Sequence, residues 1–324
     1  MRRKPSAHAA AKPAAARAIA ALAASALLLV LAGCGRSPAP GASAKASAQA
    51  AASVGPVLAV ETFLADIAQQ VAGSRLTVGT LMPAGIDPHS YEPTPRDVST
   101  VTESRALIVN GAGMESFLQK LLASAGGERR LIEASAGLEP RKSGSEPDPH
   151  FFLAPLLVAR YVENIRDGLA ALDPAGAATY SANAAAYTAK LRELDGWIRA
   201  QVAGIPAADR LLVTNHESLG YFAESYGFTV IGTIVPGVST GVSPSARQLA
   251  RLIDELRATG AKAIFLESGT DPKLARQVAR EAGIRVVTEL YTHSLTEAGG
   301  PAPSYIRMME YNVTTIVDAL GVTR

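Results

Sequence analysis

Four histidines are the residues of this sequence best suited to bind a metal ion: His89, His150, His216 and His293. The fifth, His8, lies in an N-terminal segment that we expect to be removed. Imidazole is the commonest protein ligand for transition metals. His89 and His150 each end an Asp-Pro-His tripeptide, and the proline restricts the backbone in front of both rings. We therefore expect the fold to gather four imidazoles around one metal ion.

Three of these histidines follow stretches that we predict to be strands. His89 follows 75–82, His216 follows 211–214, and His293 follows a strand that ends near 290. Strands and helices alternate on both sides of residues 173–205, which predicts an α/β fold of two lobes, each with a parallel sheet flanked by helices. Ligands of open parallel sheets bind beyond the carboxyl ends of the strands. A metal held by histidines of both lobes would therefore lie in the cleft between them.

One long helix is predicted to join the lobes. Asp173 and Pro174 are typical of an N-cap and a first helical position. Large apolar side chains follow at helical spacing. A helix of roughly 28 residues is about 40 Å long, so we expect a rigid link. The predicted organisation is a signal peptide at 1–33, a lipidated cysteine and flexible tether at 34–55, an N-terminal metal-binding lobe at 56–172, the linking helix at 173–205 and a C-terminal metal-binding lobe at 206–324.

The N-terminus has the pattern of a secretion signal. Five basic residues accompany an apolar run from Ala18 to Ala32, and the run ends in Leu-Ala-Gly-Cys34, which resembles a bacterial lipobox. The resemblance implies cleavage before Cys34 and acylation of this residue, and hence a lipid anchor on the extracytoplasmic face of the cell membrane. An uncleaved signal anchor is the alternative. Cys34 is the only cysteine, which excludes an internal disulfide and a cysteine-based metal site.

The charge balance gives no reason to expect nucleic acid as a partner. Without residues 1–33 the chain carries 26 basic and 29 acidic residues, so the basic character of the full sequence belongs to the leader.

Four segments resemble the metal-binding lipoproteins of ABC importers, the zinc and manganese solute-binding class of the cluster A-I, or TroA-like, type. They are Gly85 to Pro95, Asp148-Pro-His-Phe-Phe-Leu153, Asn215 to Gly227, and Ser304 to Asn312. The resemblance covers about residues 56 to 322. It implies that His89, His150 and His216 are metal ligands, and that the partners are an ABC permease and, through it, a cytoplasmic ATPase. We expect this chain to act as a monomer.

The fourth ligand departs from the family pattern. Members commonly have aspartate where this sequence has His293. Either His293 completes a four-imidazole site, or Glu267 or a water takes the fourth position. We favour His293, with Glu267 as a neighbour of the ligands. Asp87, Asp148 and Glu217 are candidates to accept hydrogen bonds from the ring N–H groups.

The expected donor set favours Zn²⁺, with Mn²⁺ as the alternative. Nitrogen donors suit zinc, whereas manganese prefers carboxylate oxygen. The loop at 139–149 contains no histidine, however, although many zinc-type relatives carry a histidine-rich loop there.

The sequence therefore predicts a binding module and not an enzyme. A zinc hydrolase needs an open coordination position, and the chain has no His-Glu-x-x-His helix. A role in cell adhesion is compatible with transport, but no motif favours it.

Overall fold

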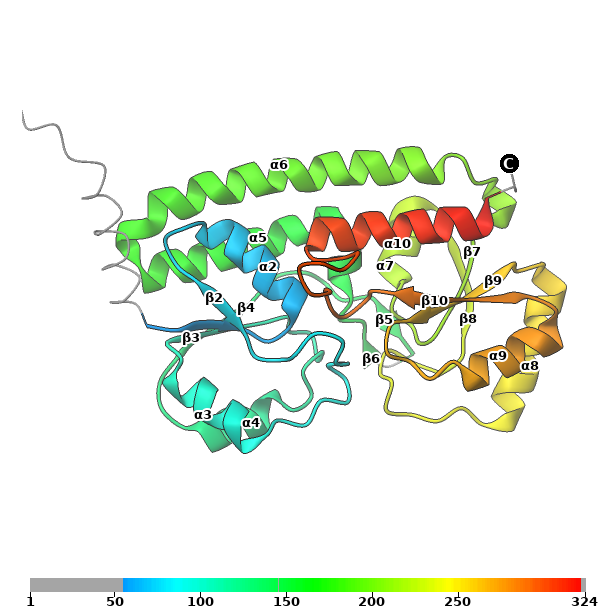
Figure 1. The fold of residues 1–324 in the computed structure, drawn as a ribbon, viewed down its shortest axis with the longest axis horizontal. Helices are drawn as coiled ribbons and strands as arrows, with labels where there is room; N and C mark the ends of the chain where they lie inside the picture. Colours follow the sequence, from blue (N-terminus) through cyan, green and yellow to red (C-terminus); the bar gives the residue numbers. More distant parts are fainter. Residues whose placement is uncertain (1–54, 145, 322–324) are drawn as a thin grey trace, which may run out of the picture. The chain divides into compact units, whose positions relative to one another are not determined.

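Two four-stranded parallel sheets organise the chain. The computed structural model describes residues 55–144 and 146–321, so the predicted leader, Cys34 and most of the tether lie outside the described residues. The N-terminal sheet has the order β2-β1-β3-β4 and the C-terminal sheet the order β10-β9-β7-β8 (Figure 1). If the strands of each sheet are numbered in chain order, both sheets have the spatial order second, first, third, fourth. The predicted fold class is confirmed, and the two sheets share one topology.

The elements of the first sheet alternate as predicted. They are β1 (Val57–Ala59), α2 (Thr62–Ala72), β2 (Val78–Thr80), α3 (Pro95–Glu103), β3 (Ala106–Val109), α4 (Leu118–Ala125) and β4 (Arg130–Glu133). A short antiparallel hairpin follows, formed by β5 (Lys142–Ser143) and β6 (Glu146–Pro147). The sequence predicted only a loop at 139–149.

The helices between the sheets are α5 (Pro155–Leu172) and α6 (Ala177–Val202). The second sheet and its helices then follow in alternation: β7 (Leu211–Thr214), α7 (Gly220–Tyr226), β8 (Thr229–Thr233), α8 (Ala246–Thr259), β9 (Ala263–Glu267), α9 (Lys273–Ala282), β10 (Arg285–Leu290) and α10 (Tyr305–Leu320). Short 3₁₀ turns lie at Phe151–Leu153, Pro174–Gly176 and Ala207–Asp209.

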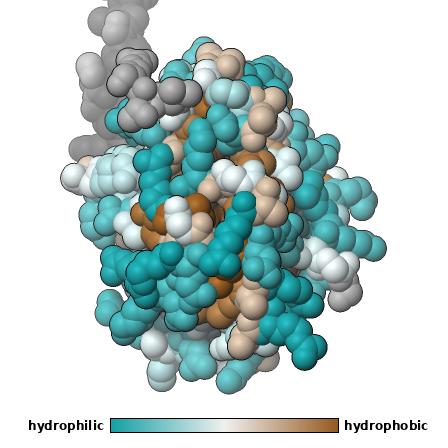
Figure 2. All heavy atoms as spheres, turned by 90° about the vertical axis from the view of Figure 1, so that its right-hand side faces the viewer, coloured by the Kyte–Doolittle hydropathy of each residue, from teal (hydrophilic) through white to brown (hydrophobic). Residues whose placement is uncertain are grey.

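Each sheet packs against apolar cores on both faces, as is typical of parallel sheets, and its two inner strands are largely buried. In β3, Ala106 and Ile108 face a core that the sheets share with the long helices, whereas Leu107 and Val109 face a second core beneath α3 and α4. The strand β9 alternates in the same way, with its other face packed against α8 and α9. The shared core runs without a break from the first sheet to the second. Figure 2 views the end of the molecule at the right of Figure 1, where hydrophilic side chains cover most of the surface.

The long helix α6 lies along elements of both halves. It contacts α2 and α5 of the first half, and α7 and α10 of the second (Figure 1). The residues of its buried stripe include Tyr180, Tyr187 and Leu191. At 26 residues it is about 39 Å long. Among the described residues, no helix combines the length and the apolar character that a membrane crossing requires.

Asp173 lies at an N-cap position as predicted, followed by Pro174, but it is the N-cap residue of the 3₁₀ turn Pro174–Gly176 that leads into α6. Its side chain makes no cap hydrogen bond, and α6 begins only after a 3₁₀ turn. Instead, the carboxylate accepts hydrogen bonds from Arg75 (2.8 Å from Nη2 to Oδ1) and from the hydroxyl of Tyr180 (2.6 Å). A charged partner stabilises a carboxylate more than a backbone N–H does, so the distant arginine determines where this side chain points.

A buried pair of carboxyl groups, Glu61 and Glu115, lies beyond the carboxyl ends of β1 and β3. Glu115 accepts hydrogen bonds from the backbone N–H groups of Asn110 and Gly111. Burial raises its pKa from 4.5 to about 7. Burial, and next the charge of Glu115, raise the pKa of Glu61 well above its ordinary value. The folded protein therefore binds protons that the unfolded chain releases. The stability this contributes is complete below pH 4.5 and is lost as the pH rises through 7.

The substitution Glu61→Gln is expected to stabilise the protein at pH 8 by about 1–2 kcal/mol, because the folded chain then no longer has to retain a proton at position 61 that the unfolded chain releases. The gain should fade as the pH falls to 4.5, where the unfolded chain takes up the proton as well. Urea denaturation at both pH values measures the difference. Glu103→Gln, at an exposed position of α3, is the control and should show no such dependence on pH. Equal destabilisation by Glu61→Gln at both pH values would contradict this account.

Candidate metal centre

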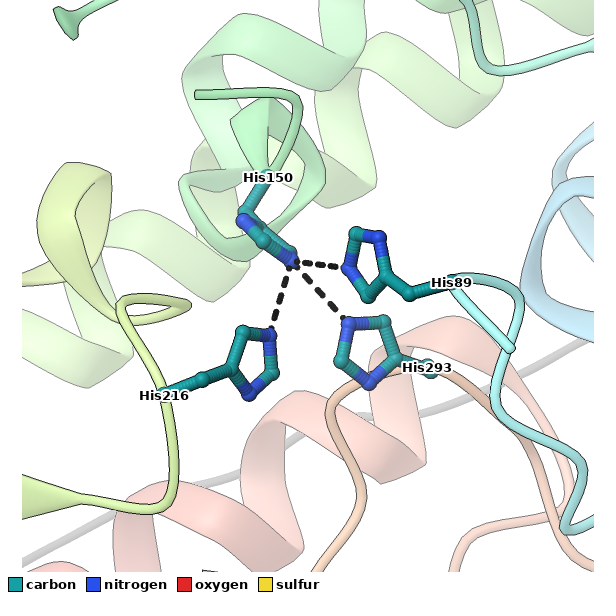
Figure 3. Close-up of side chains that lie close together, drawn as sticks. All are labelled: His89, His150, His216 and His293. Atoms are coloured by element: carbon teal, nitrogen blue, oxygen red, sulfur yellow. Dashed lines mark hydrogen bonds between the residues drawn. The ribbon is translucent and has the colours of Figure 1, made fainter. Parts of the chain in front are cut away.

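The four histidines converge on one point between the two sheets. One ring nitrogen from each of His89, His150, His216 and His293 lies within 4.8 Å of those of the other three (Figure 3). His150 Nε2 lies 3.2 Å from His89 Nε2, 3.3 Å from His216 Nε2 and 3.0 Å from His293 Nε2. Nitrogens around a tetrahedral zinc ion, with Zn–N distances of 2.0–2.1 Å, are roughly 3.3 Å apart. The spacing of the rings therefore fits a single small cation.

Loops at the ends of strands carry three of the four rings. His216 comes two residues after β7 ends, and His293 three residues after β10 ends. β10 has an irregular register before Leu290, and Glu289 has a positive φ of 73° there. Such a bulge redirects the chain, in this case just ahead of His293. His89 lies on the longer loop between β2 and α3.

His150 reaches the cluster from the segment between β6 and α5. Its Nδ1 lies 2.8 Å from Asp148 Oδ1, and its backbone N–H donates to the same oxygen at 3.0 Å. With the Nδ1 proton donated to Asp148, the neutral ring keeps an unprotonated Nε2. One lone pair cannot bond three neighbouring ring nitrogens, but a cation placed among them satisfies all four. Burial, followed by the charges of the other three rings, holds the pKa of His150 well below its ordinary value.

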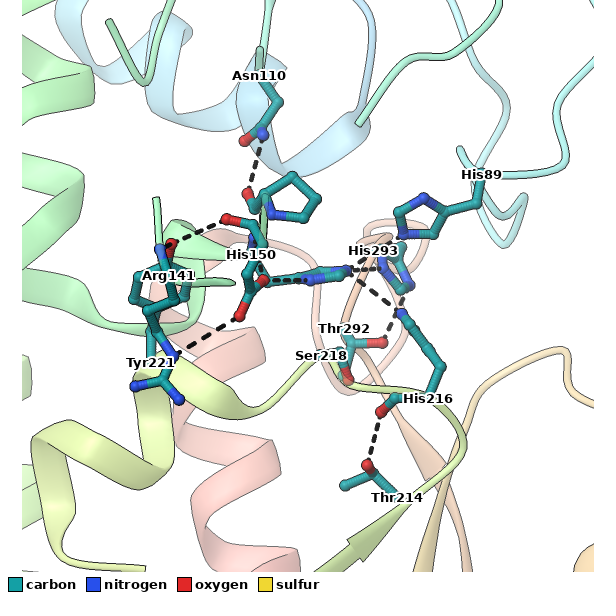
Figure 4. A network of polar contacts seen from close by, with 12 residues as sticks. His89, Asn110, Arg141, His150, Thr214, His216, Ser218, Tyr221, Thr292 and His293 are labelled. Carbon is teal, nitrogen blue, oxygen red and sulfur yellow. Dashed lines mark hydrogen bonds and ion pairs between the residues drawn. The ribbon is translucent and has the colours of Figure 1, made fainter. Parts of the chain in front are cut away.

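Polar contacts fix the segment that carries His150 from both sides (Figure 4). Asn110, at the end of β3, donates to the carbonyl of Pro149 at 3.0 Å. On the other side, the hydroxyl of Tyr221 in α7 donates to the carbonyl of Asp148 at 2.8 Å. Tyr221 also accepts a hydrogen bond from the backbone N–H of Arg141, which anchors the start of the hairpin. The ring is thus positioned by residues from both halves of the chain.

Glu267 lies on the outer side of two rings and not at their convergent nitrogens. Its Oε1 lies 2.9 Å from His216 Nδ1, and its Oε2 lies 3.5 Å from His293 Nδ1. The hydroxyl of Ser218 donates to Oε1 at 3.0 Å. Burial opposes ionisation of this carboxyl, but the two rings outweigh it and hold the pKa of Glu267 well below its ordinary value. An ionised Glu267 would orient both rings and offset part of the charge of a bound cation.

The other predicted acceptors behave differently. Asp87 accepts a hydrogen bond from the backbone N–H of His89 at 2.9 Å, and not from its ring. For Glu217, the described contacts include a backbone bond to Gly237 but none to a histidine ring. Ser218, Tyr221 and Thr292 were not predicted from the sequence as parts of the site. The hydroxyl of Thr292 lies 3.1 Å from His293 Nδ1. Ser218 and Thr292 lie within two residues of a predicted ligand, and this proximity is the signal that could have indicated them.

Exposure distinguishes one ring from the other three. His150 and His216 are fully buried and His293 is 7% exposed, whereas His89 is only partly buried. Burial, followed by the charges of His293 and His216, lowers the pKa of His89 to about 3. A proton is therefore disfavoured on His89 and His150, which leaves their nitrogen lone pairs available to a metal.

Each lobe has a parallel sheet flanked by helices, one long helix joins the two lobes, and four ring nitrogens converge where the lobes meet. These features define a two-lobed metal-binding protein. Residues 57–319 match the family described as the periplasmic component A of the zinc-uptake complex. The chain belongs to this family. Its members are substrate-binding components of metal importers and not enzymes, so the prediction of a binding module is confirmed and the hydrolase alternative is wrong.

Relatives with different metals in their names match the chain similarly well. The manganese-binding lipoprotein MntA of Halalkalibacterium halodurans is 34% identical over 80% of this chain and 86% of its own length. The iron-binding protein YfeA of Yersinia pestis is 32% identical over 82% of this chain and 86% of its own. The structure of the periplasmic zinc-binding protein TroA from Treponema pallidum superposes with a TM-score of 0.77 at 27% identity. It covers 83% of this chain and 99% of TroA. Family membership alone therefore leaves the metal open.

Proposed function

We propose that this protein captures Zn²⁺ outside the cytoplasm and delivers it to an ABC permease that a cytoplasmic ATPase drives. The observation that carries the proposal is the convergence of four ring nitrogens at one point, with the carboxylates Asp148 and Glu267 on the outer side of three rings. In this proposal His89, His150, His216 and His293 are the ligands. Glu267 orients His216 and His293 without binding the metal.

The donor set supports zinc over manganese. Four imidazole nitrogens and no carboxylate oxygen suit zinc, whereas Mn²⁺ is better served by oxygen ligands. The close spacing of the nitrogens favours four-coordination, which zinc adopts readily. The same role with Mn²⁺ as cargo is the alternative, and it has the support of relatives whose names include manganese.

We propose the organisation predicted from the sequence for the delivery role. Residues 1–33 would direct export, Cys34 would carry the lipid, and 34–55 would tether the two metal-binding lobes, 56–172 and 206–324, with their linking helix at 173–205. Relatives named as lipoproteins of ABC transporters support an extracytoplasmic protein held at the membrane. The lipid would keep the cargo near its permease.

Metal selection tests the proposal directly. Purified metal-free protein is incubated with equimolar Zn²⁺, Mn²⁺ and Fe²⁺, desalted and analysed for its elements. We expect one zinc per chain and less than a tenth as much manganese or iron, because nitrogen donors favour zinc. A chain that takes up mainly manganese supports the alternative cargo, and a chain that retains no metal refutes the binding role. Isothermal titration with each metal alone provides the independent measurement.

A further inference from the structure

The loop that carries His89 is bonded to the opposite half of the molecule at Gly85 and Asp87, whereas its end is held in its own half by Tyr91, which packs against Phe117. This loop runs from residue 83 to 92, between β2 and α3. The backbone N–H of Gly85 donates to the hydroxyl of Ser294 at 2.7 Å, and Ser294 directly follows the ligand His293. The hydroxyl of Thr240 donates to Asp87 Oδ2 across a sequence separation of 153 residues. Thr240 lies on the loop between β8 and α8, in the C-terminal half.

Apolar packing contributes little to the first part of this loop, residues 83–87, where Gly85 is exposed and Ile86 is 40% exposed. Further along, Pro88 is buried and Tyr91 packs against Phe117. Cavities border the loop on two sides. One, of about 260 Å³, lies between residues 84–87 and the segment that carries His293. The other, of about 360 Å³, lies between Asp87 and the ends of β8 and β9. A segment with few buried apolar contacts opens locally at a low free-energy cost.

The carboxylate of Asp87 connects the anchor point to the ligand. Oδ1 accepts the backbone N–H of His89 at 2.9 Å, and Oδ2 accepts the hydroxyls of Thr240 and, at 3.3 Å, Ser90. The position of His89 is thus coupled through one side chain to the loop of the opposite lobe. The side chains of His150, His216 and His293 are buried, whereas that of His89 is partly exposed.

We infer that the loop 83–92 is the gate of the site and that the Asp87–Thr240 hydrogen bond is its latch. This inference rests on the proposed metal-binding function. In it, His89 is the ligand that leaves first, and Thr240 is a positioning residue that acts on the metal through Asp87. Breaking the latch frees the loop, so the release of metal accelerates while the other three rings remain in place. No wide separation of the lobes, which the continuous core and α6 would resist, is needed.

The test compares release rates in the full mature chain loaded with Zn²⁺. Stopped-flow transfer to an excess of a chromophoric chelator gives the dissociation rate, and mixing metal-free protein with Zn²⁺ gives the association rate. Thr240→Val keeps the shape of the side chain but removes the donor. A hydrogen bond to a charged group is worth enough that we expect dissociation about tenfold faster, with less than a twofold change in association. Thr240→Ser restores the donor and should return the rate to within twofold of the original.

A matched substitution and a double-mutant cycle separate the latch from a general loss of structure. Thr259→Val also removes a threonine hydroxyl, but one that bonds only to its own helix at Glu255, so release should not change. In an Asp87→Ala background, Thr240→Val should have little further effect, because the two residues act as a pair.

Unchanged dissociation in Thr240→Val, or acceleration that Thr240→Ser does not reverse, would overturn the latch while leaving the metal-binding function intact. Absence of zinc binding in the unaltered chain would instead refute the proposed function itself.

Discussion

The substitution His150→Ala is expected to lower the affinity for Zn²⁺ by on the order of 10³-fold or more, the largest effect of any single change in the chain. His150 is fully buried, and its Nε2 lies 3.0–3.3 Å from the corresponding atom of all three other rings. Removing it takes away a ligand whose tautomer and orientation are already fixed by Asp148. Loss of an outer hydrogen-bond partner alone typically costs 10–100-fold in metal affinity, so loss of the ligand itself should cost more.

Competition with a chromophoric zinc chelator measures this affinity. Asp148→Asn provides the graded comparison, since it leaves the ring in place but weakens the acceptor, and it should fall between the unaltered chain and His150→Ala. Circular dichroism checks that both variants are folded. Zinc binding of unaltered affinity in His150→Ala would place the metal elsewhere and remove the basis of the proposed function.

The substitution His293→Asp is expected to shift the metal preference towards Mn²⁺ by about 10–100-fold. It replaces a nitrogen donor by a carboxylate oxygen, which manganese prefers. The new carboxylate would lie near Glu267, whose Oε2 is 3.5 Å from His293 Nδ1 in the present chain. Two neighbouring carboxylates repel each other, and a bound divalent cation offsets this repulsion.

Equimolar competition between Zn²⁺ and Mn²⁺, read by elemental analysis, gives the ratio of the two affinities. The control His293→Asn has nearly the shape of aspartate without its charge, and it should lose zinc without gaining manganese. Identical metal ratios in the two variants would show that the residue at position 293 does not select the metal. Full zinc loading of both variants would mean that His293 is not a ligand, and would leave Glu267 as the candidate for the fourth position.

Much of the fold could be predicted because its signals are local. The alternation of apolar strands and amphipathic helices indicated two parallel sheets, and both are present with one shared topology. The spacing of Tyr180, Tyr187 and Leu191 indicated the long helix, and all three are buried along it. Periodicity of this kind depends only on neighbouring residues, since side chains three or four positions apart share one face of a helix.

Contacts between distant segments could not be predicted in this way. Asp173 has the sequence of an N-cap, yet it binds Arg75, which lies 98 residues earlier in the chain. The hairpin β5–β6 is short and polar, and the segment at its start is held by Tyr221, 80 residues further on. Their partners come from other parts of the fold, and neither the pattern around Asp173 nor that around Tyr221 identifies them.

The sequence by itself determined which residues could bind a metal and that three of them would follow strands. The carboxyl ends of parallel strands meet at one edge of a sheet, so His216 and His293, two and three residues past β7 and β10, are brought to the same edge. Only the tertiary structure decided that the four ring nitrogens lie within 4.8 Å of one another, that Glu267 lies behind two of the rings, and that Thr240 holds the loop of His89. These relations depend on how the two sheets are packed against their shared helices, and that packing sums many weak contacts far apart in the chain.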